Sequence, residues 1–466
     1  MEIESASVSR SELVSNASKR SKGYGKTCFR VLLAGLICVI LALLIALLVG
    51  LQRQHEWIGI HKANSMTQKR PLHTVPDCII LHDSRDRHLD MAKCVLDSYP
   101  LIDGHNDLSW QFLNNVNNTV YGSVDFTTDL RKVWTTTKTR FPSHTDIPRL
   151  RQGKVGAQFW AIFVPCSSQY KDPVRRSLEQ TDFHHKMFKK YSKYLKYVTT
   201  AQGILNAFNE GKIASLLGLE GGHSIDSSLA NLRMFYKLGC RYMTITHSCN
   251  TPWADNWKVD LNNSSKYNGL TEFGKIVIKE MNRLGMIIDL SHVAKETMID
   301  AIQVSSAPVM FSHSSAYGYC NHYRNVQDDV LRMTKENGGL VMVNFGADFI
   351  NCKPNKQPNA TLSQVADHIE YIKNLIGVEY VGIGADYDGV AVQPVGLEDV
   401  SKYPYLFAEL NRRGWSEEDL RKLAGENLIR VFRKVEQVRD ELSYMPPYEV
   451  HLPSSEYVNG TCRTGF

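Results

Sequence analysis

The stretch Pro100-Leu101-Ile102-Asp103-Gly104-His105-Asn106-Asp107 ends an apolar run with an imidazole and a carboxylate two residues apart. Successive side chains of a strand point to opposite faces, so His105 and Asp107 would project the same way and could bind one ion. A single His near an Asp is more often an ordinary hydrogen-bonded pair. The metal interpretation therefore depends on whether other ligand residues end equivalent strands.

Seven further strand-like apolar runs follow along the chain, at 156–164, 213–219, 242–246, 286–290, 309–311, 340–345 and 380–384. Between most of them lie amphipathic helical patterns with apolar residues three and four positions apart, such as those at 273–284, 295–305 and 362–376. This alternation predicts an α/β fold, a (β/α)8 barrel of the TIM type. A doubly wound open sheet shows the same alternation, and the positions of the polar residues favour the barrel.

Polar residues of metal-binding or acid-base type close six of the eight runs. In a barrel the carboxyl ends of the strands converge on one mouth, where the chemistry takes place. These residues are His105 with Asp107, Glu220, His247, His292, His313 and Asp386, with Asn344 nearby. His, Asp and Glu seldom occupy strands, so chance placement explains the pattern poorly.

Five of these residues offer nitrogen or oxygen ligands and no sulfur, a set that suits zinc. They are His105, Asp107, Glu220, His292 and His313. Five ligands are one more than a single tetrahedral ion binds. They can hold two ions about 3.5 to 4 Å apart when one carboxylate bridges the ions. We expect two zinc ions per subunit, with Glu220 as the bridge. The alternatives are a surface acid in a turn and ordinary buried histidines.

Three further residues have side chains suited to substrate chemistry. Asp386 could carry a proton to a leaving amine, with Asp388 as its local rival and a purely structural turn as the alternative. His247 could donate a hydrogen bond to a carbonyl oxygen that develops charge. Arg324 offers a fork for a carboxylate, although an arginine in a loop is usually only solvated.

The N-terminal region predicts a membrane anchor. Residues 29–51 are apolar apart from Arg30 and are long enough to cross a bilayer as a helix. Basic residues on its N-terminal flank predict a type II protein of the cell membrane, with the catalytic domain extracellular. A cleaved signal peptide is the alternative. The C-terminus lacks the apolar tail that a GPI-anchor signal needs, so a lipid anchor is not expected. The expected parts are a cytosolic tail (1–28), the span (29–51), a stalk (52–95), the barrel (96–445) and a C-terminal tail (446–466).

The composition excludes other classes of protein. With 22% charged and 43% hydrophobic residues the chain is globular, and its net charge of +6 without an aromatic-interleaved basic stripe argues against nucleic-acid binding. Eight cysteines follow the span, none in a CxxC pair, so we expect extracellular disulfides. Glycosylation is expected at the sequons of Asn117, Asn262, Asn263, Asn359 and Asn459.

Taken together, the motifs resemble the membrane dipeptidase (renal dipeptidase) family from about residue 96 to residue 445. The matching stretches are Asp103–Asp107, Leu219–Gly222, Thr246–Asn256, Asp289–His292, Phe311–Ala316, Arg324–Val326 and Gly384–Gly389. Two departures are the N-terminal span, where well-known members have a cleaved signal and a lipid anchor, and Ser109, where the family often has proline.

The resemblance implies an amidohydrolase-type barrel with two zinc ions. His105 and Asp107 would bind one ion, His292 and His313 the other, and Glu220 both. His247, Arg324 and Asp386 would contact the substrate, with Arg324 near its carboxylate and Asp386 as the proton carrier. The resemblance also implies the disulfides Cys166–Cys249 and Cys320–Cys352, and a homodimer linked through Cys462.

The predicted function is that of a membrane-anchored, zinc-dependent dipeptidase in which a metal-bound hydroxide attacks the peptide carbonyl. The family's substrates include dipeptides with a C-terminal D-residue, cysteinyl-glycine conjugates such as leukotriene D4, and certain β-lactams. Two alternatives remain. One is a catalytically silent cell-surface binding protein on the same barrel, and the other is an amidohydrolase that acts on another amide or a lactone.

Overall fold

The computed structural model describes residues 78, 86–134, 141–352 and 360–454. The predicted span at 29–51, the cytosolic tail, most of the stalk and Cys462 lie outside these residues. Within the described part, no helix combines the length and the apolar character needed to cross a bilayer. All described residues belong to one structural unit that begins at Cys78.

Eight parallel strands close into a barrel, as the sequence predicts. Neighbours follow the order β2-β1-β9-β8-β7-β6-β5-β4, and pairing between β2 and β4 closes the ring. The strands are β1 (Leu101–Asn106), β2 (Val155–Phe163), β4 (Ile213–Glu220), β5 (Cys240–Thr244), β6 (Ile287–Asp289), β7 (Met310–Phe311), β8 (Leu340–Val343) and β9 (Val381–Ile383). The closed ring excludes the open sheet. A ninth strand, β3 (Leu195–Tyr197), pairs with the start of β4 and was not predicted.

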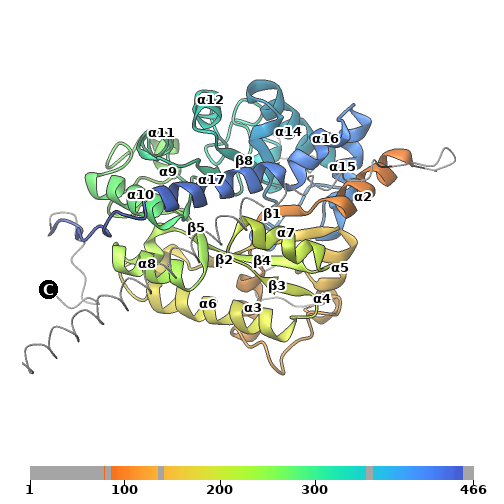
Figure 1. Ribbon diagram of the computed structural model, residues 1–466, viewed down its shortest axis with the longest axis horizontal. Coiled ribbons are helices and arrows are strands. Elements are labelled where there is room, and N and C mark those ends of the chain that lie inside the picture. The colour runs from red at the N-terminus through yellow and green to blue at the C-terminus, as the bar shows by residue number, and fades with distance from the viewer. Residues whose placement is uncertain (1–77, 79–85, 135–140, 353–359, 455–466) are drawn as a thin grey trace, which may run out of the picture. The chain divides into compact units, whose positions relative to one another are not determined.

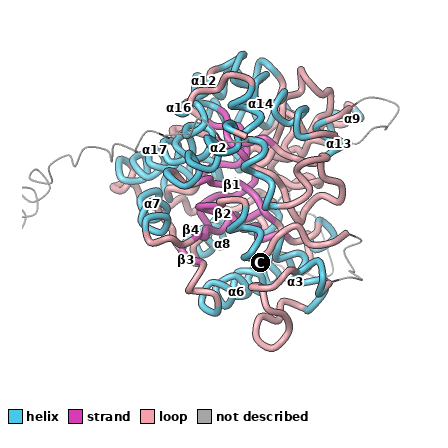
Figure 2. Tube along the Cα trace, turned by 90° about the vertical axis from the view of Figure 1, so that its right-hand side faces the viewer, coloured by secondary structure: helices cyan, strands magenta, loops and turns pink. Residues whose placement is uncertain are grey.

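Helices surround the strands (Figures 1 and 2). They are α2 (Arg87–Ser98), α3 (Leu108–Val116), α4 (Leu130–Val133), α5 (Ile147–Gln152), α6 (Pro173–Lys190), α7 (Ala201–Asn209), α8 (Leu229–Lys237), α9 (Lys258–Asn262), α10 (Glu272–Leu284), α11 (Lys295–Val304), α12 (Asp328–Asn337), α13 (Ala347–Ile350), α14 (Leu362–Ile376), α15 (Tyr403–Arg412), α16 (Glu417–Arg421) and α17 (Asn427–Glu441). The three predicted helices correspond to α10, α11 and α14.

Local signals set the ends of these helices. Thr361 and Gln364 form a reciprocal capping box at the start of α14. The helix α10 begins after Thr271, whose side chain accepts from the amide of Gly274, and ends at Gly285 with φ +77°. Glycine adopts this left-handed conformation without the steric cost that other residues incur.

The folded body begins earlier than expected. The helix α2 starts at Arg87, inside the segment 52–95 that we expected to be a stalk, and its Ala92 and Val95 are fully buried. A disulfide between Cys78 and Cys94 ties this helix to the segment before it. Apolar side chains on one face of α2 explain the difference, because they pack into the main core.

One end of the barrel is filled by α17. Its Phe432 and Val435 belong to the same buried cluster as Ile102, Ile287 and Leu340, which lie at or next to the first residues of their strands. These contacts place α17 across the amino ends of the strands. The carboxyl ends, where the predicted ligands lie, are left for the functional site.

A glycine in β4 makes room for a tyrosine inside the barrel. A Cβ atom at Gly218 would lie 1.9 Å from Cζ of Tyr242, so any larger residue would displace the ring. Tyr242 is fully buried, and its hydroxyl reaches Nδ1 of His105 at 2.8 Å. Packing within the barrel thus continues into the functional site.

We predict that Phe432→Ala lowers the free energy of unfolding by about 3 to 5 kcal/mol, because the truncation leaves a cavity beneath the strands. Urea denaturation measures the change. Tyr444→Ala is the control, since that ring is 82% exposed and its loss should change stability by no more than about 0.5 kcal/mol. Equal effects of the two substitutions would contradict the packing role of α17.

Candidate metal centre

The five predicted ligand residues meet at the carboxyl ends of the strands, around the carboxylate of Glu220. Its Oε2 lies 3.5 Å from Nε2 of His105, which is 3.1 Å from Oδ2 of Asp107. Its Oε1 lies 3.1 Å from Nε2 of His292 and 3.5 Å from Nε2 of His313. The two oxygens of one carboxylate therefore face different imidazoles, His105 on one side and His292 with His313 on the other.

The donor atoms fit a cation better than they fit each other. Nε2 of His105 is buried and lies 3.1 Å from Oδ2 of Asp107 without the geometry of a hydrogen bond, and Nε2 of His292 and Nε2 of His313 lie 2.9 Å apart. Nδ1 of His105 and Nδ1 of His313 are engaged by the hydroxyls of Tyr242 and Ser312 at 2.8 and 2.7 Å. Imidazole Nε2 atoms that converge on carboxylate oxygens suit a divalent metal. The three triplets of possible ligands overlap at this point, namely His105 with Asp107 and Glu220, His105 with His313 and Asp386, and Glu220 with His247 and His292.

Unusual backbone conformations hold this arrangement. His292, Asp386 and Asp388 have φ between +63° and +68°, a region that costs non-glycine residues energy and is frequent at functional sites. Neighbouring segments hold the turn at His292, whose carbonyl accepts from the amide of Trp257 and the hydroxyl of Thr246. The strand-end turns are thus fixed by contacts outside their own sequence.

Burial and neighbouring charges shift the pKa values of the acids and imidazoles here. Desolvation, helped by nearby His and Arg charges, holds the pKa values of His247, His292 and His313 well below 6.5, so these rings are neutral at physiological pH. For His105, burial opposes protonation, but Tyr242, Asp107 and Glu220 outweigh it and raise the pKa. Neutral imidazoles are the form that binds metals.

Asp386 rather than Asp388 faces the cluster. Burial raises the pKa of Asp386 to about 8, although His105 opposes the shift, and the charges of Asp107 and Glu220 add to it. Its Oδ2 accepts a hydrogen bond from the Asn344 amide at 2.8 Å. Asp388 instead accepts from the backbone amide of His144 at 2.8 Å, and its own amide donates to Nδ1 of His144 at 3.0 Å. This favours Asp386 as the proton carrier of the two.

Arg324 is a buried cation beside the cluster. Arg324 is 3% exposed. Its guanidinium donates to the hydroxyl of Ser314 at 3.3 Å and to the carbonyl of His313 at 3.2 Å. Its Nε is buried and has no hydrogen-bond partner. Burial lowers its pKa to about 10, so it remains charged at neutral pH. Since no carboxylate of the described residues lies within 4.0 Å of this guanidinium, the site suits an anion from outside.

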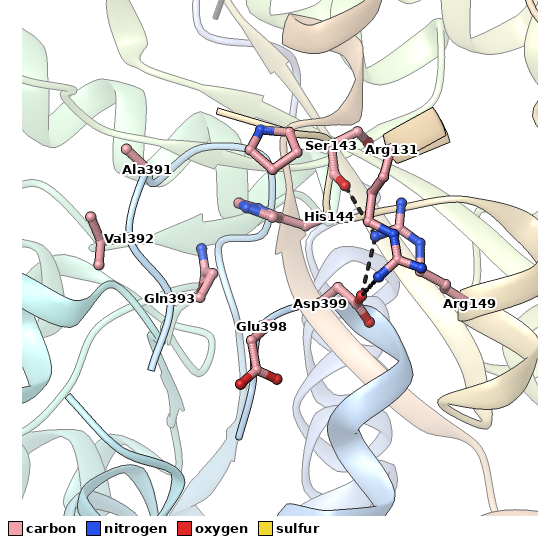
Figure 3. Close-up of a pocket in the computed structure, with 10 residues that line it drawn as sticks. Arg131, Ser143, His144, Arg149, Ala391, Val392, Gln393, Glu398 and Asp399 are labelled. Carbon is pink, nitrogen blue, oxygen red and sulfur yellow. Dashed lines mark hydrogen bonds and ion pairs between the residues drawn. The ribbon is translucent and has the colours of Figure 1, made fainter. Parts of the chain in front are cut away.

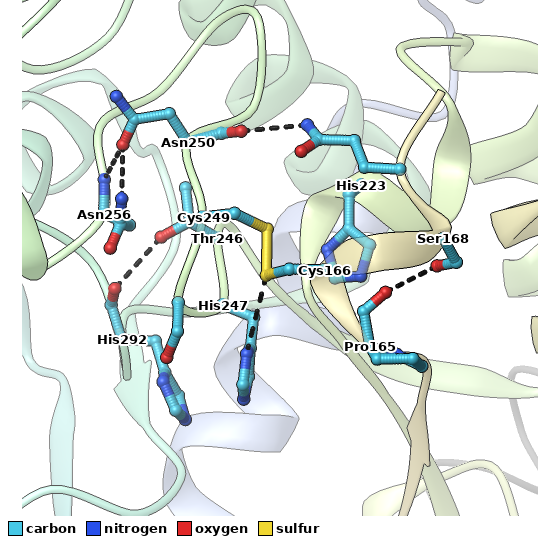
Figure 4. The surroundings of a disulfide bond; sticks show 12 residues. Pro165, Cys166, Ser168, His223, Thr246, His247, Cys249, Asn250, Asn256 and His292 are labelled. Carbon is cyan, nitrogen blue, oxygen red and sulfur yellow. Dashed lines mark hydrogen bonds between the residues drawn. A yellow bond between two sulfur atoms is a disulfide. The ribbon is translucent and has the colours of Figure 1, made fainter. Parts of the chain in front are cut away.

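A disulfide lies beside His247 (Figure 4). Cys166 and Cys249 are bonded, and Nδ1 of His247 lies 4.0 Å from Sγ of Cys166. The bond joins the loops that follow β2 and β5, and the ring of His247 packs 4.2 Å from that of His292. The second disulfide that the resemblance implied, Cys320–Cys352, is also present.

The sequons divide between the described part and the rest of the chain. Asn117, Asn262 and Asn263 are exposed, whereas Asn359 and Asn459 lie outside the described residues. Exposure leaves the first three accessible, and their glycosylation remains a prediction.

A separate pocket of about 300 Å³ lies between residues 142–149 and 391–399 (Figure 3). Arg131 and Arg149 both donate to Oδ2 of Asp399, at 3.0 and 3.3 Å, so the charges that line it are paired. None of the predicted site residues lines this pocket. Arg149 also donates to the carbonyl of Ser143 at 3.0 Å, so these paired charges help to hold the segment that carries His144.

Three residues around the predicted ligands were not predicted as functional. Tyr242, Asp289 and Ser312 form hydrogen bonds to the imidazoles of predicted ligands or to residues that do so. Asp289 and Ser312 lie within the stretches that resemble the family, which was the available signal. Tyr242 lies in a strand, and only the folded structure brings it to His105.

Comparison with known proteins identifies the relatives of this chain. A family described as Membrane dipeptidase (Peptidase family M19) matches residues 89–445. Dipeptidase 3 from Mus musculus is 44% identical over 382 residues, which cover 82% of this chain and 73% of that protein. Dipeptidase 3 from Rattus norvegicus is also 44% identical and covers 82% of this chain and 74% of its own length.

Solved structures share the fold. The metallopeptidase named dipeptidase AC has a TM-score of 0.62 at 26% identity, and the match covers 72% of this chain and 98% of that one. A metallopeptidase from Rhodobacter sphaeroides, solved with a phosphinate mimic of the dipeptide L-Ala-D-Ala, has a TM-score of 0.61 at 24% identity. That match covers 72% of this chain and 99% of the bacterial one.

His368 predicts a loss of stability in acid. Its Nδ1 accepts from the amide of Ala316 and its Nε2 donates to the carbonyl of Ile350, both at 3.1 Å, and burial lowers its pKa from 6.5 to about 4. Because the unfolded state binds the proton more tightly, stability is lost as pH falls from 6.5 towards 4.

Between pH 7 and pH 5 this group should cost about 2 kcal/mol of unfolding free energy. Urea denaturation at both pH values checks this, with His368→Gln as the control. The Gln side chain can replace both hydrogen bonds but does not titrate. The same acid loss in both proteins would contradict the assignment.

Proposed function

Because the chain belongs to the membrane dipeptidase family (peptidase family M19) and is therefore a metallodipeptidase, we propose that two zinc ions at the barrel mouth serve to cleave dipeptides. The observation that supports this proposal most directly is the position of Glu220. Its Oε1 faces His292 and His313, and its Oε2 faces His105, which is next to Asp107. A pair of metal ions bridged by a carboxylate requires one carboxylate that lies between two sets of nitrogen and oxygen donor atoms, and Glu220 has this position.

The residues would divide the chemistry among themselves. When bound, the ions would lower the pKa of a water molecule and polarise the scissile carbonyl. His247, neutral and 3.6 Å from Glu220, would donate a hydrogen bond to the carbonyl oxygen as its charge grows. Asp386, whose pKa burial raises to about 8, would hold a proton and pass it to the leaving amine.

The position of Arg324 supports short substrates. Its guanidinium donates to the main-chain carbonyl of His313, so a carboxylate bound there would lie next to the metal ligands. A free C-terminus so close to the scissile bond leaves room for one residue beyond it. We expect dipeptides, with a C-terminal D-residue tolerated, and cysteinyl-glycine conjugates such as leukotriene D4. The last two expectations rest on the family resemblance.

The sequence supports a cell-surface setting for this activity. We expect the apolar segment 29–51 to anchor the protein with residues 52–466 outside the cell, and Cys462 to link two copies. Glycosylation of the exposed Asn117, Asn262 and Asn263 would accompany this topology.

Hydrolysis of Gly-D-Ala by the purified protein, followed by amine release, tests the proposed function. We expect a chelator to abolish cleavage and added Zn²⁺ to restore it. Glu220→Gln should reduce kcat/KM by at least about 100-fold, because the amide cannot bridge two cations as the carboxylate can.

Cleavage that resists the chelator would overturn the metal mechanism. Full metal binding without cleavage of any dipeptide would favour the binding-protein alternative. Cleavage of N-acyl amino acids or lactones, without cleavage of dipeptides, would favour the alternative of an amidohydrolase that acts on another amide or a lactone.

Arg324→Gln should lower kcat/KM for Gly-D-Ala by about 10- to 100-fold, chiefly through KM, because one charge-assisted hydrogen-bond pair is lost. The matched control is the same dipeptide with a C-terminal carboxamide, on which the variant and the parent should differ little. An equal loss on both substrates would show that Arg324 does not bind the carboxylate.

A further inference from the structure

We propose that Asp289 and Ser312 form a relay that sets the tautomer of His313 and so presents its Nε2 lone pair to a metal ion. This inference rests on the proposed metal centre and assigns positioning roles to two residues that do not touch the ion. Asp289, Ser312 and His313 are all 0% exposed, so no bulk water competes with their hydrogen bonds.

The carboxylate of Asp289 is held by four donors. Oδ1 accepts from the backbone amides of Ser291 and Ser312 at 3.1 and 2.7 Å. Oδ2 accepts from the hydroxyls of Thr244 and Ser312 at 2.5 and 2.6 Å. Asp289 therefore connects the ends of three neighbouring strands, β5, β6 and β7, at the level of the ligands.

The direction of the next hydrogen bond follows from counting protons. Ser312 carries one hydroxyl proton, and a carboxylate can only accept. That proton points to Oδ2 of Asp289 at 2.6 Å, because the other oxygen acceptor within reach, Oγ of Ser291, is 3.5 Å away. Oγ of Ser312 also lies 2.7 Å from Nδ1 of His313, and at this contact it must act as the acceptor. Nδ1 of His313 therefore carries the proton, and Nε2 carries the lone pair that faces Oε1 of Glu220 at 3.5 Å.

The other imidazoles in the cluster lack this relay. His105 contacts the phenol of Tyr242, whose hydroxyl can donate or accept, and Nδ1 of His292 is buried without a partner. His313 is thus the predicted ligand whose tautomer is dictated by a carboxylate held by four donors. Partners of this kind change metal affinity by about 10- to 100-fold when they are removed.

Asp289→Asn reverses the relay while it preserves the shape. Oδ1 of the amide can still accept from the two backbone amides, and its NH2 group can donate to the hydroxyl oxygens of Thr244 and Ser312. The hydroxyl of Ser312 would then be free to donate to Nδ1 of His313. That places the imidazole proton on Nε2, where it points at the metal site.

The test measures Zn²⁺ affinity of the full chain by competition with a chelator, and zinc bound per subunit. Of the two zinc ions, we expect Asp289→Asn to weaken the binding of the one that His313 holds, by about 10- to 100-fold. Adding Ser312→Ala to Asp289→Asn should recover part of this affinity, because it removes the reversed donor and leaves His313 free to change tautomer. A merely structural role predicts no such rescue.

Thr244→Val is the matched control. It removes a hydroxyl from the same carboxylate oxygen but leaves the bond between Ser312 and His313 unchanged, so zinc affinity should stay within about threefold. Thermal unfolding of the zinc-free proteins separates a loss of fold from a loss of metal. If Asp289→Asn does not fold, Ser312→Ala alone tests the relay, and we expect a weaker zinc site in a zinc-free protein that still unfolds cooperatively.

Wild-type affinity in Asp289→Asn, or in Ser312→Ala if only that variant folds, would overturn the relay and leave the proposed function intact. A double variant that binds zinc more weakly than Asp289→Asn would also overturn it. A wild-type protein that binds no Zn²⁺ would instead overturn the metal centre itself.

Discussion

The pairing of β2 with β4 is the constraint on which the rest of the structure depends. It closes the ring and sets Phe163 opposite Glu220, the last residue of β4. With the ring closed, the carboxyl ends of parallel strands must share one mouth, and α17 covers the other end. Glu220 can then lie between imidazoles that come from β1, β6 and β7. An open sheet would leave these residues along an edge, too far apart to share one carboxylate.

Burial at this mouth determines the chemistry of the groups gathered there. Desolvation holds His247, His292 and His313 neutral, and the same burial helps to keep a proton on Asp386. Several acids and one guanidinium without a nearby carboxylate would be costly inside a protein that had no ligand for them. Under the proposed function these groups have a purpose, because metal ions and a substrate carboxylate would bind among them.

Much of the fold followed from the sequence because buried parallel strands are continuous apolar runs. The eight predicted strands and three predicted helices are present, with ends that differ by only a few residues. The missed elements have physical reasons. The strand β3 has only three residues, and α2 has a low mean apolar content, so its buried Ala92 and Val95 were concealed among charges. The disulfide between Cys78 and Cys94 could not be chosen among the possible pairings from spacing alone.

By itself the sequence identified the candidate ligand residues and placed them at the ends of predicted strands, because residue type and strand periodicity are local properties. Only the tertiary structure decided which oxygen of Glu220 faces which imidazoles, why Asp386 rather than Asp388 faces them, and how Asp289 reaches His313 through Ser312. These are relations between strands far apart in the chain. They depend on register, left-handed turns and the direction of single hydrogen bonds, none of which a linear pattern records.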